Sequence, residues 1–391
     1  MAVYKLFPLQ DTTIYSSYPL MNTGLDAICE VFNILTPDGA LSVSRYLMQF
    51  DNNEIKDIVN KIGEKEYDVF LRNFISTAQG VNSNVSLEIR PLAQQWNNGT
   101  GYYLNNPQTQ DGASWNAPLY SGSTVWASYG TYNGFSFTSS YNSTYSEPGG
   151  GNWFYDDSDL FYVLYNYTDP SYTQGSSLNI PKTQSFELRE SKDITVNVKS
   201  IVQTWYTDTI PNYGFIVKLT GSQEFNPSQY VQPVLKYYSV DTNTIYPPQL
   251  EFRWRDYSSV ITENSPIVTT TDLKMSLAEN PGTFNPESVN RFYINVSPLY
   301  PTRVYQTSSL FTNLNYLPTS SYYAIKDLAT NEFVINFDEQ YTQISSDNKG
   351  NYFDVYMSGL EPERYYKILI KTIINGSTLI FDDDYYFKVI N

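Results

Sequence analysis

Short apolar runs alternate with turn signals along most of the chain, which has 391 residues. The runs are rich in Tyr, Phe, Val, Ile and Thr, the residues that suit a half-buried pleated surface. Glycine, proline, asparagine and aspartate separate the runs as short turn sequences. The clearest are Pro37-Asp38-Gly39, Asn98-Gly99, Asp111-Gly112, Asn133-Gly134, Pro247-Pro248 and Asn375-Gly376. Short strands between regular turns are typical of sandwiches, so the pattern predicts an all-β protein.

Two segments interrupt the alternation with helical spacing. Residues 51–66 carry isoleucine or valine at 55, 58, 59 and 62, which places these side chains on one helical face. Asp51 or Asn52 can cap the start of this helix, and Gly63 can end it. A second, shorter helix is expected after the strand 194–198. There the apolar residues at 198, 201, 202 and 205 repeat the helical spacing before Pro211.

The strand pattern forms two systems, which predicts two domains. The first covers residues 1–254, a polar linker covers 255–271, and the second domain covers 272–391. In the second domain we expect strands at 291–296, 322–327, 333–337, 352–357, 366–372 and 384–389. Inside the first domain, residues from about 97 to 177 are dense in Gly, Ser, Asn, Thr and aromatics. We expect long loops and hairpins there, with one strand at 161–167.

The charge balance narrows the range of partners. The chain has 24 Lys and Arg against 40 Asp and Glu, a net charge of −16. Nucleic acids and anionic membranes are bound chiefly through Lys and Arg, so neither is an expected partner. Charged residues make up only 16% of the chain, against about a quarter in a usual globular protein. Tyr, Asn, Ser, Thr and Gln must therefore cover much of the surface.

The residues that are missing exclude several kinds of catalytic site, and for carboxylate-only chemistry, which stays open, the sequence has no local signature. We therefore do not expect an enzyme. The sequence has no histidine, which removes Ser-His-Asp and Cys-His nucleophiles and histidine-ligated zinc. Cys29 is the only cysteine. Because it lies in the alternating strand 27–31, it is expected to be a small buried residue. No stretch approaches the roughly 18 apolar residues of a membrane-spanning helix. The first ten residues do not resemble a signal peptide, so we expect synthesis in a reducing cytoplasm.

Seven short motifs follow one another in the first domain. They are Asp11-Thr12-Thr13-Ile14-Tyr15, Asn22-Thr23-Gly24, the run Ser44 to Asp51, Trp96, Trp115, the run Ile194 to Val198 with Val202 and Trp205, and Asn212-Tyr213-Gly214-Phe215. Together they resemble the DNRLRE-type β-sandwich modules, a jelly-roll-like family that includes carbohydrate-binding modules. The resemblance covers about residues 5–254. It implies an N-terminal jelly-roll-like sandwich with two short helices and long loops.

The second domain has one comparable landmark. Leu360-Glu361-Pro362-Glu363-Arg364-Tyr365-Tyr366 resembles the L-x-P-x-x-x-Y signature of fibronectin-III and other immunoglobulin-like sandwiches. The resemblance implies a C-terminal immunoglobulin-like sandwich. It also implies that the Tyr366 hydroxyl bonds back to the corner before its strand.

The acidic, Tyr- and Asn-rich, cysteine-poor texture of the whole chain resembles virion structural proteins of marine tailed phages of the myovirus type. This resemblance implies a non-enzymatic particle component, present in several copies, assembled in the host cytoplasm and bound to other virion proteins. Tail, baseplate, neck and capsid-surface positions all stay open. The alternative is a carbohydrate-binding adhesin component that contacts host surface glycans.

Aromatic residues in the long loops are the first candidate site. Trp115, Trp126, Tyr132 and Trp153 can stack on sugars, bury against another subunit or pack within their own loops. The sequence favours packing or an interface over glycan contact.

Carboxylates are the second candidate site. Asp156, Asp157 and Asp159 can supply oxygen ligands to Ca²⁺, although the sequence favours a solvated acidic turn there, and no other cofactor is expected. Asp382, Asp383 and Asp384 are expected in a hairpin turn, or as charged residues that protect a strand from aggregation, rather than at a metal.

Overall fold

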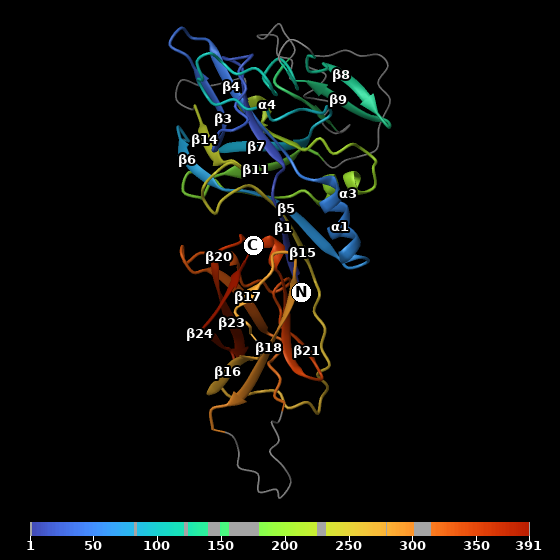
Figure 1. Ribbon diagram of the computed structural model, residues 1–391, viewed down its shortest axis with the longest axis vertical. Helices are drawn as coiled ribbons and strands as arrows, with labels where there is room; N and C mark the ends of the chain where they lie inside the picture. The colour runs from blue at the N-terminus through green and yellow to red at the C-terminus, as the bar shows by residue number, and fades with distance from the viewer. Residues whose placement is uncertain are drawn as a thin grey trace, which may run out of the picture. The chain divides into compact units, whose positions relative to one another are not determined.

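The computed structural model describes residues 2–81, 84–120, 124–139, 149–155, 180–224, 232–278, 280–300 and 314–390. The chain divides into two compact units (Figure 1). Unit 1 contains residues 1–5, 62–68 and 252–391, and unit 2 contains residues 6–61 and 69–251. The sequence boundary was set at 254, and this division falls between residues 251 and 252. However, residues 255–271 belong to unit 1 and are not a separate linker, and two short N-terminal segments also belong to unit 1.

Unit 2 is built on an eight-stranded sheet with the order β11-β7-β13-β4-β3-β14-β6, in which β2 also pairs with β4. The strands are β2 (Gln10–Tyr15), β3 (Ile28–Leu35), β4 (Leu41–Gln49), β6 (Ile75–Gln79), β7 (Val85–Pro91), β11 (Lys182–Phe186), β13 (Phe215–Leu219) and β14 (Val234–Tyr238). A second sheet, β10-β9-β8, contains β8 (Tyr129–Tyr132), β9 (Phe135–Ser139) and β10 (Asn152–Phe154). Strand therefore dominates unit 2, as the alternating pattern predicts. The expected strand 161–167 lies outside the described residues.

A further four-stranded sheet has the order β1-β15-β5-β12. Its strands are β1 (Ala2–Leu6), β15 (Gln249–Trp254), β5 (Tyr67–Asn73) and β12 (Ile194–Asn197). Along β1, β5 and β15 the chain passes from one unit into the other. This explains how N-terminal residues come to belong to unit 1.

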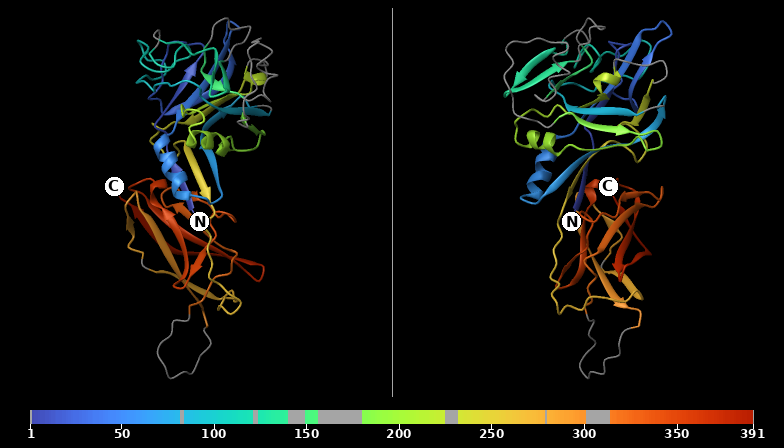
Figure 2. Two further views of the ribbon diagram at one scale, coloured as in Figure 1. Left: turned by 90° about the vertical axis from the view of Figure 1, so that its right-hand side faces the viewer. Right: turned by 180° about the vertical axis from the view of Figure 1, so that it is seen from behind.

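Both predicted helices are confirmed. Helix α1 covers Asn52–Ile62, and the Asp51 carboxylate accepts a hydrogen bond from the Asn53 N–H at 2.7 Å. Gly63 follows the helix with φ +66°, the left-handed conformation that ends helices. Helix α3 (Lys199–Tyr206) lies beside α1 (Figure 2), and the two elements are joined by a hydrogen bond from the Tyr206 hydroxyl to Asn60. A short helix, α4 (Gly221–Glu224), was not predicted.

Unit 1 has a β-sandwich-like architecture of two sheets, β16-β18-β22-β21 and β17-β24-β23-β19-β20. The first contains β16 (Leu273–Ala278), β18 (Val289–Pro298), β21 (Ser345–Asp347) and β22 (Gly350–Tyr356). The second contains β17 (Thr283–Phe284), β19 (Ser321–Asp327), β20 (Phe333–Ile335), β23 (Tyr365–Ile374) and β24 (Ser377–Val389). Each predicted strand of the second domain overlaps one of these, and β16, β17 and β21 were not predicted.

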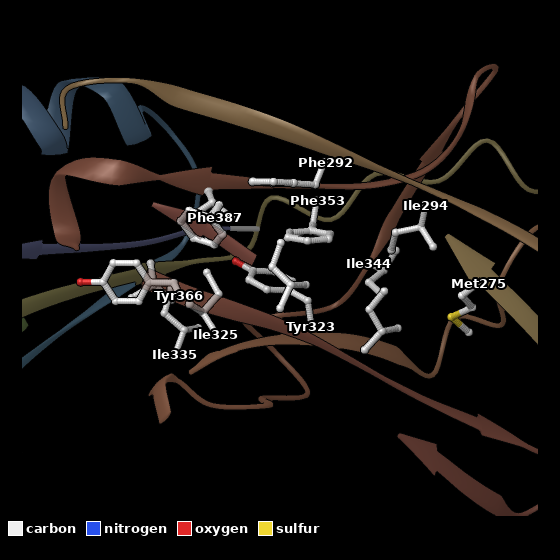
Figure 3. Packing of buried hydrophobic residues seen from close by; sticks show 14 of the residues in the cluster. Met275, Phe292, Ile294, Tyr323, Ile325, Ile335, Ile344, Phe353, Tyr366 and Phe387 are labelled. Atoms are coloured by element: carbon white, nitrogen blue, oxygen red, sulfur yellow. The ribbon is translucent and has the colours of Figure 1, made fainter. Parts of the chain in front are cut away.

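Side chains from both sheets form one core in unit 1 (Figure 3). The ring of Phe353 lies between those of Phe292 and Tyr323, with ring centroids 5.3 and 4.3 Å apart. Phe387 extends the aromatic cluster from β24, and Val3 of β1 belongs to the same core. Aromatic side chains bury large areas, so this core accounts for part of the aromatic content.

The predicted turn at residues 382–384 is wrong in its position. The hairpin turns at Asn375 and Gly376, whose φ values of 50° and 78° suit a two-residue turn between twisted strands. Residues 382–384 lie inside β24 as a bulge, because three residues there oppose Leu369 alone. The Lys367 ammonium binds the carboxylates of Asp382 and Asp384. These acids therefore neutralise a lysine of the neighbouring strand.

Candidate functional site

The tryptophans that were predicted to contact a ligand or partner are buried in unit 2. Trp115, Trp126 and Trp153 are 7%, 1% and 7% exposed, and they pack in one cluster with Leu47 and Ile216 of the large sheet. The indole N–H of Trp126 donates to the Ser114 carbonyl at 2.9 Å. Little indole surface is left for a sugar or a second protein at Trp115, Trp126 and Trp153. Of the interpretations above, packing within the loops describes them.

Tyr132 differs from the tryptophans. It is 43% exposed at the end of β8, next to the β8–β9 turn. This turn is formed by Asn133 and Gly134 and is held by a hydrogen bond from the Asn133 side chain to the Thr209 carbonyl. Contact of Tyr132 with a glycan or a partner stays a prediction.

Arg45 lies against two of the clustered tryptophans. Its guanidinium carbon is 4.9 Å from the centre of the Trp115 ring and 5.2 Å from that of Trp153. Two of its nitrogens donate to the Glu224 carboxylate at 2.6 and 2.9 Å. Both side chains are fully buried. A desolvated arginine with a bidentate carboxylate and two aromatic neighbours is held in one geometry, so it fixes the loops that carry the tryptophans.

Further charges extend this pair across the sheet. Lys218 of β13 lies opposite Glu88 of β7, and their charged groups are 2.5 Å apart. Lys218 also contacts Glu224 at 3.3 Å, and Arg90 contacts Glu88 at 3.3 Å. Burial alone would raise the pKa of Glu88, but Lys218 and Arg90 outweigh it and hold that pKa at about 2. We call Arg45, Glu88, Arg90, Lys218 and Glu224 the ion cluster.

Three consecutive glycines, residues 149–151, let the chain pack closely against the ion cluster and its tryptophans. The Gly150 carbonyl accepts a hydrogen bond from the Arg45 guanidinium. A Cβ on Gly150 would lie 2.6 Å from Arg45 and 2.7 Å from Trp115, and a Cβ on Gly149 would lie 2.8 Å from Trp115. Only glycine fits so close to these side chains. The Gly149-Gly150-Gly151 run is therefore a packing requirement of the cluster.

A second fixed point lies at Asn22. Its side-chain nitrogen donates to the carbonyls of Asn98 and Ala113 at 2.7 and 2.9 Å, and its side-chain oxygen accepts from the Gly101 N–H at 2.9 Å. A Cβ at Gly101 would lie 2.1 Å from the Asn22 carbonyl oxygen. Asn22 thus joins its own loop to the loop of residues 98–113, which is distant in sequence. This gives the Asn-x-Gly sequence at residues 22–24 a structural role. We call these contacts the Asn22 hub.

Exposed apolar side chains concentrate on the same loops. Of the 22 large hydrophobic residues that are exposed in the described parts of the chain, eight lie between residues 102 and 132. They are Tyr102, Tyr103, Leu104, Leu119, Tyr120, Val125, Tyr129 and Tyr132. Loops that buried contacts hold in place, and that expose apolar side chains to solvent, are suited to contact with another molecule. This combination is the candidate functional site.

The predicted calcium ligands, Asp156, Asp157 and Asp159, lie outside the described residues. Within the described ranges, no three Asp, Glu, Cys or His side chains gather as a metal site requires. Calcium binding by these aspartates stays a prediction.

Cys29 is buried, as predicted, and it lies beside a carboxylate that sequence analysis missed. Asp11 is 1% exposed and accepts a hydrogen bond from the Val240 N–H at 2.7 Å. Burial raises the pKa of Asp11 to about 8, against the effect of that hydrogen bond. Burial also raises the pKa of the Cys29 thiol, so it is not a reactive thiolate. Both groups belong to the interior of the protein.

Two charged residues within strand sequences are a signal for the ion cluster. Arg45 stands in the strand sequence VSRYL, where it is the only charged residue, and Lys218 stands in the otherwise apolar strand FIVKL. A buried charge requires a partner. The partners could not be identified, because Glu224 is 179 residues from Arg45 in sequence.

A comparison of the sequence with protein-family models finds no match, and a comparison with curated proteins finds no similar sequence. None of the helices in the described ranges has the length and apolar character needed to cross a membrane.

Proposed function

We propose that the chain is a non-enzymatic structural protein of a tailed-phage virion that acts through protein–protein assembly. One observation carries the proposal. The exposed Tyr, Leu and Val side chains of residues 102–132 stand on loops, and at Tyr129 and Tyr132 on strand β8, and the ion cluster and the Asn22 hub fix these loops internally. In this proposal the chain is present in several copies and occupies a tail, baseplate, neck or capsid-surface position.

The rigidity of the loops supports an assembly role. Ordering a loop on binding costs free energy that is subtracted from the affinity. Loops that are already ordered do not incur this cost. Tyr contributes a large and rigid contact area, and low surface charge reduces the desolvation cost of a wide interface. The net charge of −16 favours protein partners over nucleic acid.

We further propose a jelly-roll-like fold for unit 2 and an immunoglobulin-like fold for unit 1. For unit 1 the support is Tyr366, which is 2% exposed and donates from its hydroxyl to the Glu361 carbonyl at 2.9 Å. This contact agrees with the resemblance of residues 360–366 to the corner of immunoglobulin-like sandwiches. For unit 2 the support is the antiparallel pairing of the large sheet together with its long covering loops.

The proposal is tested on purified tailed-phage particles. Mass spectrometry should detect the chain in several copies per particle. Hydroxyl-radical labelling of Tyr102, Tyr120 and Tyr129 should be severalfold weaker in the particle than in the free chain, because the loops become an interface. Absence of the chain from the particles, or equal labelling in both states, would overturn the proposal.

The alternative function is a carbohydrate-binding adhesin component. Since the tryptophans are buried, exposed tyrosines such as Tyr129 and Tyr132 would have to supply the stacking faces. A glycan array should then show specific retention that Tyr129→Ala and Tyr132→Ala abolish and that Tyr365→Ala, an exposed position of unit 1, leaves unchanged. Replacement of Trp126 is not a usable test, because truncating a buried tryptophan costs about 3–5 kcal/mol of stability. No retention, or retention that these variants leave unchanged, would exclude this function.

A further inference from the structure

One exposed leucine of unit 2 has an unfavourable backbone conformation. Leu104 has φ +56° and is 54% exposed. Residues other than glycine, asparagine and aspartate rarely adopt this left-handed conformation, because the Cβ then crowds the following carbonyl oxygen. The free chain therefore bears two costs at Leu104, strained backbone and an apolar side chain in water. Asparagine or glycine at this position would avoid both.

The surrounding turn is held by several hydrogen bonds. The Asn105 N–H donates to the Tyr102 carbonyl at 3.2 Å and closes the turn. The Tyr103 N–H donates to the Asp26 carboxylate at 3.0 Å, and the Leu104 N–H points to the sulfur of Met21 at 3.4 Å. The structure thus maintains the strained turn, and strain of this kind is concentrated at functional positions.

Aromatic side chains form the base of the turn. The ring of Tyr103 packs against those of Tyr15 and Tyr18, with centroids 5.1 and 6.1 Å apart. Tyr18 begins a neighbouring turn that is closed by the Met21 N–H, and this turn exposes Leu20. Tyr18, Leu20, Tyr103 and Leu104 therefore stand on two adjacent turns that are linked through Met21. We call these four residues the Tyr103 surface.

The charges beside this surface indicate the chemistry of its partner. Asp26 accepts a hydrogen bond from the Tyr103 N–H, and Glu30 accepts one from the Tyr15 hydroxyl at 3.2 Å. The Lys236 ammonium lies 2.5 Å from the Glu30 carboxylate and neutralises it. Asp26, Glu30 and Lys236 together therefore have a net charge of −1. Tyrosine rings next to a carboxylate suit an arginine or lysine side chain. A second copy of the chain would present the same carboxylates to the surface.

We propose that the Tyr103 surface binds a segment of another protein that carries arginine or lysine next to apolar side chains, with Leu104 as the apolar anchor. This inference rests on the proposed assembly function and specifies the partner. The free energy that is lost at Leu104 in the free chain is offset when the side chain leaves water on binding.

Labelled peptides test the proposal on the full chain. The probe is a short peptide of arginine and leucine, and the controls are a glutamate–leucine and an arginine–serine peptide of equal length. Fluorescence anisotropy should show at least tenfold tighter binding of the arginine–leucine peptide than of either control. Leu104→Asn should weaken that binding at least tenfold, and Leu188→Asn, at an equally accessible leucine with ordinary φ, should not. Asp26→Asn should weaken it and increase its tolerance of salt.

Thermal unfolding separates loss of the surface from loss of the fold. Leu104→Asn should unfold at the wild-type temperature or above it, because asparagine tolerates positive φ. Equal peptide binding by wild type and Leu104→Asn, or equal binding of the glutamate–leucine peptide, would overturn the proposal. Self-association in sedimentation experiments that Leu104→Asn abolishes would replace the basic partner with a second copy. The virion function fails independently, if purified particles lack the chain.

Discussion

At the scale of single residues, two buried carboxylates of unit 2 have opposite effects on stability. Glu88 lies between Lys218 and Arg90, and its pKa of about 2 is below the ordinary value of 4.5. The Glu88 carboxylate therefore stabilises the fold fully above pH 4.5, and this contribution is lost as the pH falls from 4.5 through about 2. Among the described residues no cation offsets the burial of Asp11, and its pKa rises from 3.8 to about 8. In the folded chain it holds a proton at neutral pH.

The raised pKa of Asp11 predicts a pH-dependent effect of Asp11→Asn. Between pH 4 and pH 8 the folded wild type binds a proton that the unfolded chain releases, so its stability decreases as the pH rises. Asparagine has the same shape and does not ionise. The variant should equal the wild type near pH 4 and exceed it increasingly towards pH 8, by at most about 1.4 kcal/mol per pH unit.

Urea unfolding at several pH values measures this difference. Tryptophan fluorescence follows unit 2, because five of the six tryptophans lie in it. Asp38→Asn is the control, since a hydrogen bond from Thr36 lowers the pKa of that exposed carboxyl. A difference between Asp11→Asn and wild type that stays constant with pH would contradict the assignment.

At the scale of elements, the ion cluster makes the loops a part of the core. Glu224 ends α4 and contacts both Arg45 and Lys218. Glu224→Gln would remove from this buried site the carboxylate that pairs with both Arg45 and Lys218. Breaking a buried pair by removing one partner costs about 3–5 kcal/mol, and unit 2 should lose this much stability.

Two measurements check this prediction, with Glu187→Gln at an exposed glutamate as the control. Urea unfolding should show the loss of stability, and acrylamide should quench tryptophan fluorescence more strongly as Trp115 and Trp153 lose their cover. A loss below about 1 kcal/mol, the value of an exposed pair, would show that the cluster does not fix the loops.

The corner of unit 1 allows a matched comparison between adjacent tyrosines. Tyr366 is buried and bonds to the Glu361 carbonyl, whereas Tyr365 is 55% exposed. Tyr366→Phe should lower the stability of unit 1 by about 0.5–1.5 kcal/mol, the net value of one hydrogen bond. Tyr365→Phe should have no measurable effect. Hydrogen exchange of the β23 amides reports the difference, and equal exchange in the two variants would mean that the hydroxyl bond is not stabilising.

The features that depend only on residues close together in the sequence could be predicted from it. Helix α1 was predicted because its spacing, cap and terminal Gly63 all lie within a dozen positions. The bulge at residues 382–384 depends on pairing with Leu369 and could not be read from its own sequence. The candidate site was predicted only in its region. Tryptophan patterns do not say whether a ring faces inward, and Leu104 is unusual only through its φ value.

At the scale of the whole molecule, the order of residues along the chain differs from the division into units. The N-terminal residues were predicted in the first domain, but residues 1–5 and 62–68 belong to unit 1 with residues 252–391. Val3 is 8% exposed within the unit 1 core, and the Lys5 ammonium donates to the Val334 carbonyl at 3.0 Å. The C-terminal domain is therefore completed by the start of the chain.

This division predicts where a change at the N-terminus acts. Val3→Ala removes two methyl groups from the unit 1 core and should lower its stability by about 1–2 kcal/mol. Hydrogen exchange of the β19 and β22 amides should accelerate accordingly, whereas the β4 and β13 amides of unit 2 should not change. Val260→Ala, at an exposed position of unit 1, is the control. Faster hydrogen exchange of the β4 and β13 amides instead would show that the N-terminal strand stabilises unit 2, as the sequence boundary at 254 implies.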